Sequence, residues 1–113
     1  MKERRKHPRT QIHFPVYFIC IDKDGKEMMQ DIAIVLNISE NGILMESSYN
    51  LPNTNYVKVM ASTKANQTIE IKGRVVYSIT VSREKFRIGI SFQDTSNKIL
   101  KFTNSLTDDF YSK

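Results

Sequence analysis

Apolar and polar residues alternate with a period of two through most of the chain, which predicts β-strands. The clearest stretch is 69–81, where apolar residues at odd positions alternate with mostly polar ones. We expect this strand to have one apolar face and one polar face. Gly73 in its middle indicates a bend or a bulge, because glycine is otherwise unfavourable inside a strand. The pattern places Tyr77 on the apolar face and therefore in the core.

Five more strands are predicted, over residues 12–21, 28–37, 43–46, 56–62 and 86–92. Asp24-Gly25 is a hairpin signal between the first two. Pro15 cannot donate a backbone hydrogen bond and indicates an edge or a bulge. In the second strand, Ile32, Ile34 and Leu36 share one face.

After Asp94 the period changes from two to between three and four. Thr95 or Ser96 can cap a helix, which we expect over residues 95–111. Its apolar face consists of Ile99, Phe102, Thr103, Leu106 and Phe110. Six strands and a terminal helix predict an all-β fold, a small antiparallel barrel whose open end or edge is covered by the helix.

The chain of 113 residues is expected to form one domain, 1–113, with an arm over 1–11 and a barrel over 12–93. No run approaches the ~20 apolar residues of a membrane span, and no apolar stretch follows the basic N-terminus as in a secretory signal. We therefore expect a cytoplasmic protein. The one cysteine, Cys20, falls on an apolar strand face and is expected to be a core thiol.

The net charge of +5 is concentrated at the N-terminus. The first nine residues hold five basic side chains and one acidic side chain, a net of +4, which leaves +1 for the other 104 residues. A basic arm on a nearly neutral body is typical of a protein that binds an anion, although a solvated tail remains the alternative.

Motifs for catalysis and for metal binding are missing from the sequence. It has no Gly-x-Ser-x-Gly elbow and neither of the glycine-rich phosphate loops, and no cluster of cysteine and histidine that could hold zinc. His7 and His13 have no carboxylate nearby in sequence with which to share a proton. We expect a protein that is not an enzyme and carries no metal or cofactor.

Two clusters have chemistry suited to a nucleotide. The first is Arg4-Arg5-Lys6-His7-Pro8-Arg9, in which Pro8 discourages a helix. Its arginines present planar forks that fit phosphate oxygens and the O6/N7 edge of guanine. The second is Asn37-Ile38-Ser39-Glu40-Asn41-Gly42 at the end of the second strand.

In that second cluster, Asn37 and Ser39 are two residues apart and point the same way if the strand continues. Both can donate and accept hydrogen bonds, as a base edge requires. Gly42 would let a ligand approach the backbone closely. The alternative is a simple turn, in which Asn37 and Ser39 bond their own backbone and Gly42 supplies a positive φ.

Taken together, Arg5-x-x-x-Arg9 and Asn37-x-Ser39-x-x-Gly42 resemble the two-part motif of the PilZ domain family. The resemblance runs from Arg4 to the C-terminal helix. Every motif position is filled, with asparagine as an accepted variant at the first place of the second part. Each half is common by chance, but the pair in this order and strand context is fairly specific.

The resemblance implies a PilZ-type barrel that serves as a bacterial, non-catalytic receptor for the second messenger cyclic di-GMP. It implies that Arg5 and Arg9 clamp phosphates and guanine edges, while Asn37, Ser39 and Gly42 hold a guanine against the barrel. The signal would pass by conformational change to an unidentified partner protein, in the family's usual context of motility or biofilm control.

Two further residues have roles suggested by the resemblance. Arg4, immediately before the first motif arginine, implies an intercalated dimer of the ligand. An aromatic in the long strand sometimes stacks on the ligand, and Tyr77 is the candidate, although its apolar position favours the core.

Two other functions remain open. A small single-stranded nucleic-acid-binding β-barrel also has a basic arm, but it spreads charge and aromatics over a sheet face. Here the body is nearly neutral and the aromatics alternate inward, so we expect no nucleic-acid partner. The other is a PilZ-fold adapter without nucleotide, against which the intact motifs argue.

Overall fold

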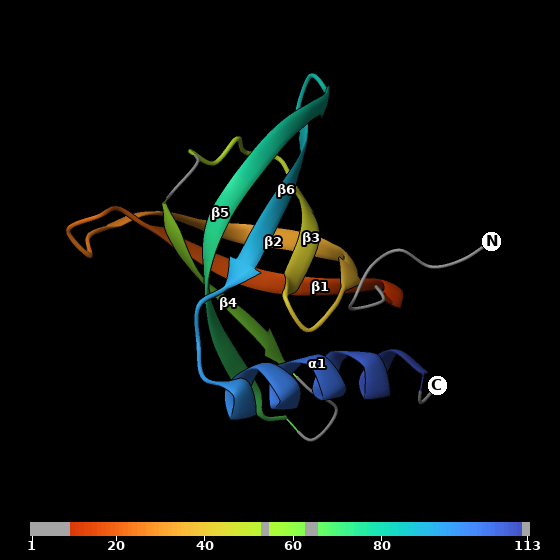
Figure 1. The fold of residues 1–113 in the computed structure, drawn as a ribbon. Coiled ribbons are helices and arrows are strands. Elements are labelled where there is room, and N and C mark those ends of the chain that lie inside the picture. The colour runs from red at the N-terminus through yellow and green to blue at the C-terminus, as the bar shows by residue number, and fades with distance from the viewer. Residues whose placement is uncertain (1–9, 53–54, 63–65, 112–113) are drawn as a thin grey trace.

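The structure is a computed structural model that describes residues 10–52, 55–62 and 66–111. In these residues the elements are β1 (Thr10–Ile21), β2 (Glu27–Ile38), β3 (Gly42–Ser47), β4 (Tyr56–Ser62), β5 (Thr68–Ser82), β6 (Lys85–Phe92) and α1 (Ser96–Tyr111). Neighbouring strands all pair antiparallel and close into a barrel in the order β1-β2-β3-β6-β5-β4 (Figure 1). The predicted all-β barrel with a C-terminal helix is therefore confirmed.

The strand boundaries agree with the expected ones to within two residues. The largest difference is at β1, which begins at Thr10 instead of residue 12. Thr10 and Gln11, which were assigned to the arm, pair with Ile38 and Asn37 of β2. Hydrogen bonding to β2 thus extends the barrel into a stretch whose polar side chains gave no strand signal.

The core consists of the side chains on the inner faces of the strands. β1 contributes Val16, Phe18 and Cys20, all buried. Burial raises the pKa of the Cys20 thiol above its ordinary value, although a hydrogen bond from Asn55 opposes the shift. The prediction of a core thiol is confirmed, and a protonated buried thiol is a poor nucleophile.

A β-bulge in β5 changes which residues face outward. Val75 pairs with Ile90 and Tyr77 pairs with Gly89, so Val76 is an extra residue without an opposite partner. One inserted residue reverses the alternation of faces. Tyr77 and Ile79 consequently lie outside, 40% and 56% exposed.

The prediction that Tyr77 belongs to the core is therefore wrong. The bulge expected at Gly73 lies three residues later, at Val76. Gly73 is still needed as a glycine, because a Cβ there would clash with the side chain of Ile90 and lie 3.0 Å from the Ser91 carbonyl oxygen.

β2 also has an irregular register, between Val35 and Asn37. Ala33 and Val35 point into the barrel and are buried. Ile32 and Ile34 share a face as expected, but it is the outer face, where Ile32 is 64% exposed.

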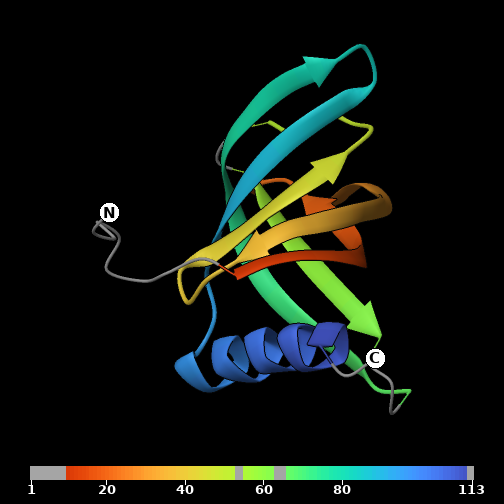
Figure 2. The ribbon, with the colours of Figure 1, turned by 90° about the vertical axis from the view of Figure 1, so that its right-hand side faces the viewer.

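α1 lies across one end of the barrel, opposite the tip of the β5–β6 hairpin (Figures 1 and 2). Phe102 and Leu106 on its inner side are fully buried. The Phe102 ring packs edge-on against Phe92 of β6, with 6.1 Å between ring centroids. Burial of these two large side chains holds the helix over the barrel end, as the sequence predicts.

The start of α1 is fixed by two polar side chains. The Thr95 hydroxyl accepts the Lys98 amide at 3.3 Å, so Thr95 is the N-cap. The Asp94 carboxylate accepts the amides of Lys72, at 3.1 Å, and of Thr95, at 2.9 Å. Asp94 thereby ties the beginning of the helix to β5.

These contacts also set the charge state of Asp94. Desolvation raises the pKa of this carboxyl, but the Thr95 and Lys72 amides and the Lys98 and Lys72 charges outweigh it, and the pKa is lowered overall.

Over the part of the chain that the structure describes, α1 included, no helix is both long and apolar enough to cross a membrane.

Candidate ligand-binding site

The turn between β2 and β3 is held by Ser39. Its backbone amide donates to the Gly42 carbonyl oxygen at 3.0 Å, and its hydroxyl accepts the Asn41 amide at 3.2 Å. Ser39 is only 5% exposed. The hydroxyl bond to Asn41 is the local one that a simple turn predicts. Within the described ranges, the Ser39 hydroxyl donates no hydrogen bond of its own.

Gly42 is required by the neighbouring strand and not by its own backbone conformation. The only glycine with a positive φ among the described residues is Gly25, so the positive φ considered for Gly42 is wrong. A Cβ on Gly42 would lie 3.0 Å from the carbonyl carbon of Ile90, and closer still to its oxygen. Glycine therefore lets β3 pass very close to β6 beside the turn.

Asn37 and the start of β1 lie at the same end of the barrel as this turn. Asn37 pairs with Gln11 of β1 on one side and with Leu44 of β3 on the other. Thr10, the first described residue, pairs with Ile38. The predicted ligand residues Arg4, Arg5 and Arg9 lie outside the described residues. Arg9 directly precedes Thr10 in sequence, and the strand that Thr10 begins, β1, is the neighbour of β2.

A shallow hollow of about 130 Å³ lies beside Gly42 on the outer face of the barrel. Its lining residues are Asn41, Gly42, Ile43, Val76, Tyr77, Gly89, Ile90 and Ser91. The Tyr77 ring lies over Gly89, where a Cβ would be 2.6 Å from the ring carbon Cζ. The bulge in β5 therefore brings an aromatic ring to the edge of the site. The alternation of apolar and polar residues did not indicate that Tyr77 faces outward. Gly89, which leaves space for the ring on the neighbouring strand, was the feature of the sequence that could have indicated it.

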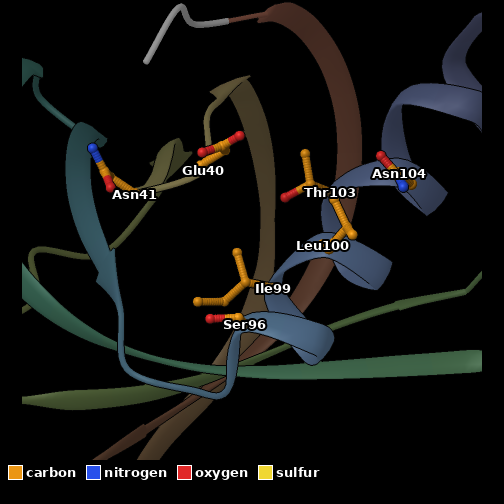
Figure 3. Close-up of a pocket in the computed structure, with 7 residues that line it drawn as sticks. All are labelled: Glu40, Asn41, Ser96, Ile99, Leu100, Thr103 and Asn104. Carbon is orange, nitrogen blue, oxygen red and sulfur yellow. The ribbon is translucent and has the colours of Figure 1, made fainter. Parts of the chain in front are cut away.

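A larger hollow of about 520 Å³ lies between the turn and α1. Figure 3 shows Glu40 and Asn41 on one side and the α1 residues on the other: Ser96, Ile99, Leu100, Thr103 and Asn104. The Thr103 hydroxyl oxygen is buried without a hydrogen-bond partner in the described part of the chain. Asn41 lines both hollows. The turn therefore borders both the hollow beside Gly42 and the larger hollow against α1.

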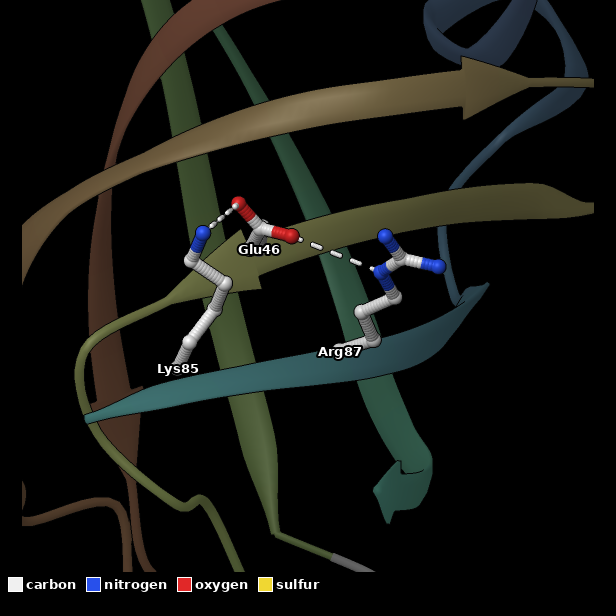
Figure 4. A network of polar contacts seen from close by, with 3 residues as sticks. All are labelled: Glu46, Lys85 and Arg87. Carbon is white, nitrogen blue, oxygen red and sulfur yellow. Dashed lines mark hydrogen bonds and ion pairs between the residues drawn. The ribbon is translucent and has the colours of Figure 1, made fainter. Parts of the chain in front are cut away.

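Ion pairs occupy the other end of β3 and β6. Glu46 accepts Arg87 at 3.4 Å and lies 3.9 Å from Lys85 (Figure 4). These exposed pairs contribute at most about 1 kcal/mol each. Both cations share the single carboxylate of Glu46. No group of acidic, histidine or cysteine residues in the described ranges could hold a metal ion.

Comparison with known families places nearly the whole chain in one of them. The family model of the PilZ domain matches residues 3–104. No curated protein matches the sequence.

Solved structures share the fold at low sequence identity. The Bacillus subtilis inhibitor of motility MotI is 13% identical, with a TM-score of 0.66 over 99% of this chain and 53% of that one. The K. pneumonia MrkH–c-di-GMP complex is 17% identical, with a TM-score of 0.65 over 99% of this chain and 56% of that one. The PilZ domain of Escherichia coli YcgR with c-di-GMP is 10% identical, with a TM-score of 0.64 over 95% of this chain and 92% of that one. The chain thus spans about half the length of MotI and MrkH.

Proposed function

The chain belongs to the PilZ domain family, and we propose that it is a non-catalytic receptor for cyclic di-GMP. The observation that carries the proposal is that β1, whose first described residue Thr10 directly follows the arginine motif in sequence, pairs with the strand that carries Asn37. Asn37 and Gly42 flank the turn closed by Ser39, and the strand that continues the Arg5-x-x-x-Arg9 arm pairs beside them.

Each residue type suits one part of the ligand. Arg5 and Arg9 bind phosphate oxygens and guanine edges in bidentate fashion. Asn37 and Ser39 hydrogen bond a guanine edge. Tyr77, at the rim of the hollow beside Gly42, offers a ring face on which a base stacks, a contact worth about 1–3 kcal/mol.

The ligand binds as an intercalated dimer in this proposal. Two molecules of cyclic di-GMP carry four negative charges, which equals the net charge of +4 on the first nine residues. Arg4 supplies the additional guanidinium. We expect two ligand molecules per chain for the natural sequence and one for Arg4→Leu, measured by calorimetric titration.

The signal leaves the site as a change of surface that a partner protein recognises. Asn41 lines both the hollow beside Gly42 and the hollow against α1, so movement of the turn on binding changes the surface beside the helix. The partner is a downstream protein in the control of motility or biofilm formation.

Arginine substitutions in the arm test the proposal. Arg5→Ala and Arg9→Ala each remove charged hydrogen bonds worth about 1.5–3 kcal/mol, or about 10- to 150-fold in affinity for cyclic di-GMP. Arg83→Ala is the matched control, because Arg83 is an exposed arginine in the hairpin at the other end of the barrel. Equal affinities for all four proteins would contradict the assignment of the clamp.

A second substitution separates base recognition from charge. Asn37→Ala should weaken cyclic di-GMP binding while leaving binding of a general polyanion such as heparin unchanged, since the amide reads a base edge. An equal loss of affinity for cyclic di-GMP and for heparin would show that Asn37 supports the barrel and does not recognise guanine.

A further inference from the structure

Arg74 lies in the same cross-strand row as Gly42. Ser91 of β6 pairs with Gly42 of β3 on one side and with Arg74 of β5 on the other. Adjacent strands are about 4.8 Å apart, so two spacings put the Cα atoms of Gly42 and Arg74 roughly 10 Å apart. A dinucleotide seated on Gly42 and a long arginine side chain together span this distance.

The Arg74 side chain is on the outer face of the barrel, on the same side as the hollow. Its neighbours Gly73 and Val75 are buried, whereas Arg74 is exposed. Alternation along the strand therefore directs Arg74 away from the core. Without the bulge at Val76, Tyr77 would lie on the opposite face from Arg74. With it, the ring and the guanidinium share one face.

The floor between these two side chains is made of small residues. Tyr77 pairs with Gly89, and Arg74 pairs with Ser91, the next outward position along β6. Gly89 and Ser91 both line the hollow beside Gly42. Val76, 41% exposed, also lines this hollow. An aromatic ring, an exposed aliphatic side chain and a cation thus lie on one face beside Gly42, an arrangement suited to a base stacked near its phosphate.

The charge of Arg74 is not neutralised by the described part of the barrel. Arg87, on the neighbouring strand, is paired with Glu46 at 3.4 Å, but Arg74 makes no ion pair with any described residue. Its direct cross-strand neighbours are Ser91 and Tyr56, both uncharged. A guanidinium so placed is available to an anion that arrives at the site.

We propose that Arg74 is a binding residue for the ligand seated at Gly42, and that it donates to a phosphate oxygen from the outer face of β5. The inference rests on the proposed function. It adds a barrel arginine to a site whose other arginines all come from the arm.

The test compares two substitutions on one strand. Arg74→Met should weaken cyclic di-GMP binding by at least about tenfold, because a charge-assisted bond is lost. Arg74→Lys should give an intermediate affinity, since lysine keeps the charge and loses the planar fork. Lys72→Met is the matched control. Lys72 is exposed on the same face of β5, two residues farther from Tyr77, and pairs with Lys58.

We expect a loss of affinity for cyclic di-GMP in Arg74→Met and a change in affinity of less than about twofold in Lys72→Met. All variants should melt near the temperature of the natural protein. Equal losses for Arg74→Met and Lys72→Met would overturn the inference, because general charge would explain them. Unchanged affinity in Arg74→Met would also overturn it while leaving the proposed function standing. A natural protein that does not bind cyclic di-GMP would overturn the proposed function and this inference together.

Discussion

Replacing Gly42 with alanine should destabilise the whole barrel, because the added methyl group has no space. The Cβ would lie 3.0 Å from the carbonyl carbon of Ile90 and 3.3 Å from the Cα of Ser91, both backbone atoms of β6. A flexible side chain could move aside, but the backbone of a paired strand cannot move without stretching the β3–β6 hydrogen bonds.

The size of the effect follows from this overlap. Overpacking by one methyl group typically costs about 1–3 kcal/mol. With an unfolding entropy of about 2.1 cal/mol/K per residue, a chain of this length loses about 4 °C of Tm per kcal/mol. We therefore expect Gly42→Ala to lower Tm by about 4–12 °C, measured by thermal unfolding followed by circular dichroism.

Gly25 provides the control, because it needs glycine for a different reason. Its φ is +84° and a Cβ there would meet nothing within 4 Å. Alanine at Gly25 therefore costs only the backbone strain, about 1–2 kcal/mol of stability. Asparagine tolerates this conformation and should restore most of the lost stability. Asparagine at Gly42 should be no better than alanine. If Gly42→Ala melted within about 1 °C of the natural protein, the steric argument would be refuted.

Two further substitutions test the helix and its attachment. Phe102→Ala should cost about 3–5 kcal/mol of unfolding free energy in chemical denaturation, because Phe102 is fully buried against Phe92; a cost below 1 kcal/mol would mean that α1 is not docked on the barrel. The lowered pKa of Asp94 predicts stability that is present above its ordinary pKa of about 3.9 and is lost as pH falls through the lower folded-state value. Asp94→Asn should lack this acid-dependent loss, and identical pH profiles of Tm for the two proteins would contradict it.

The spacing of apolar residues along the sequence predicted the six strands and the helix, apart from the first two residues of β1. Each strand has one face in the core, and a period of two records this directly, as in β1, where Val16, Phe18 and Cys20 point inward. The helix was predictable because Phe102 and Leu106 recur at helical spacing. These features depend only on neighbours along the chain.

What alternation could not predict was the position of the bulges. A bulge at Val76 depends on how β5 pairs with β6, and it reverses the faces of the residues from Tyr77 to Thr80, where the register shifts again. Tyr77 was therefore assigned to the core although it lies at the candidate site. The reason for Gly42 was hidden in the same way, since it depends on Ile90, which is distant in sequence. Motif residues were recognisable, whereas their neighbours on other strands were not.

The central claim is that this barrel binds cyclic di-GMP by recognising guanine as well as phosphate. The most direct measurement is a calorimetric titration of the natural protein with cyclic di-GMP, cyclic di-AMP and a single-stranded oligonucleotide. We predict saturable binding of two cyclic di-GMP molecules per chain and much weaker binding of cyclic di-AMP, because adenine has an amino donor where guanine has its O6 acceptor. Comparable affinity for both dinucleotides, or tighter binding of the oligonucleotide, would contradict the account.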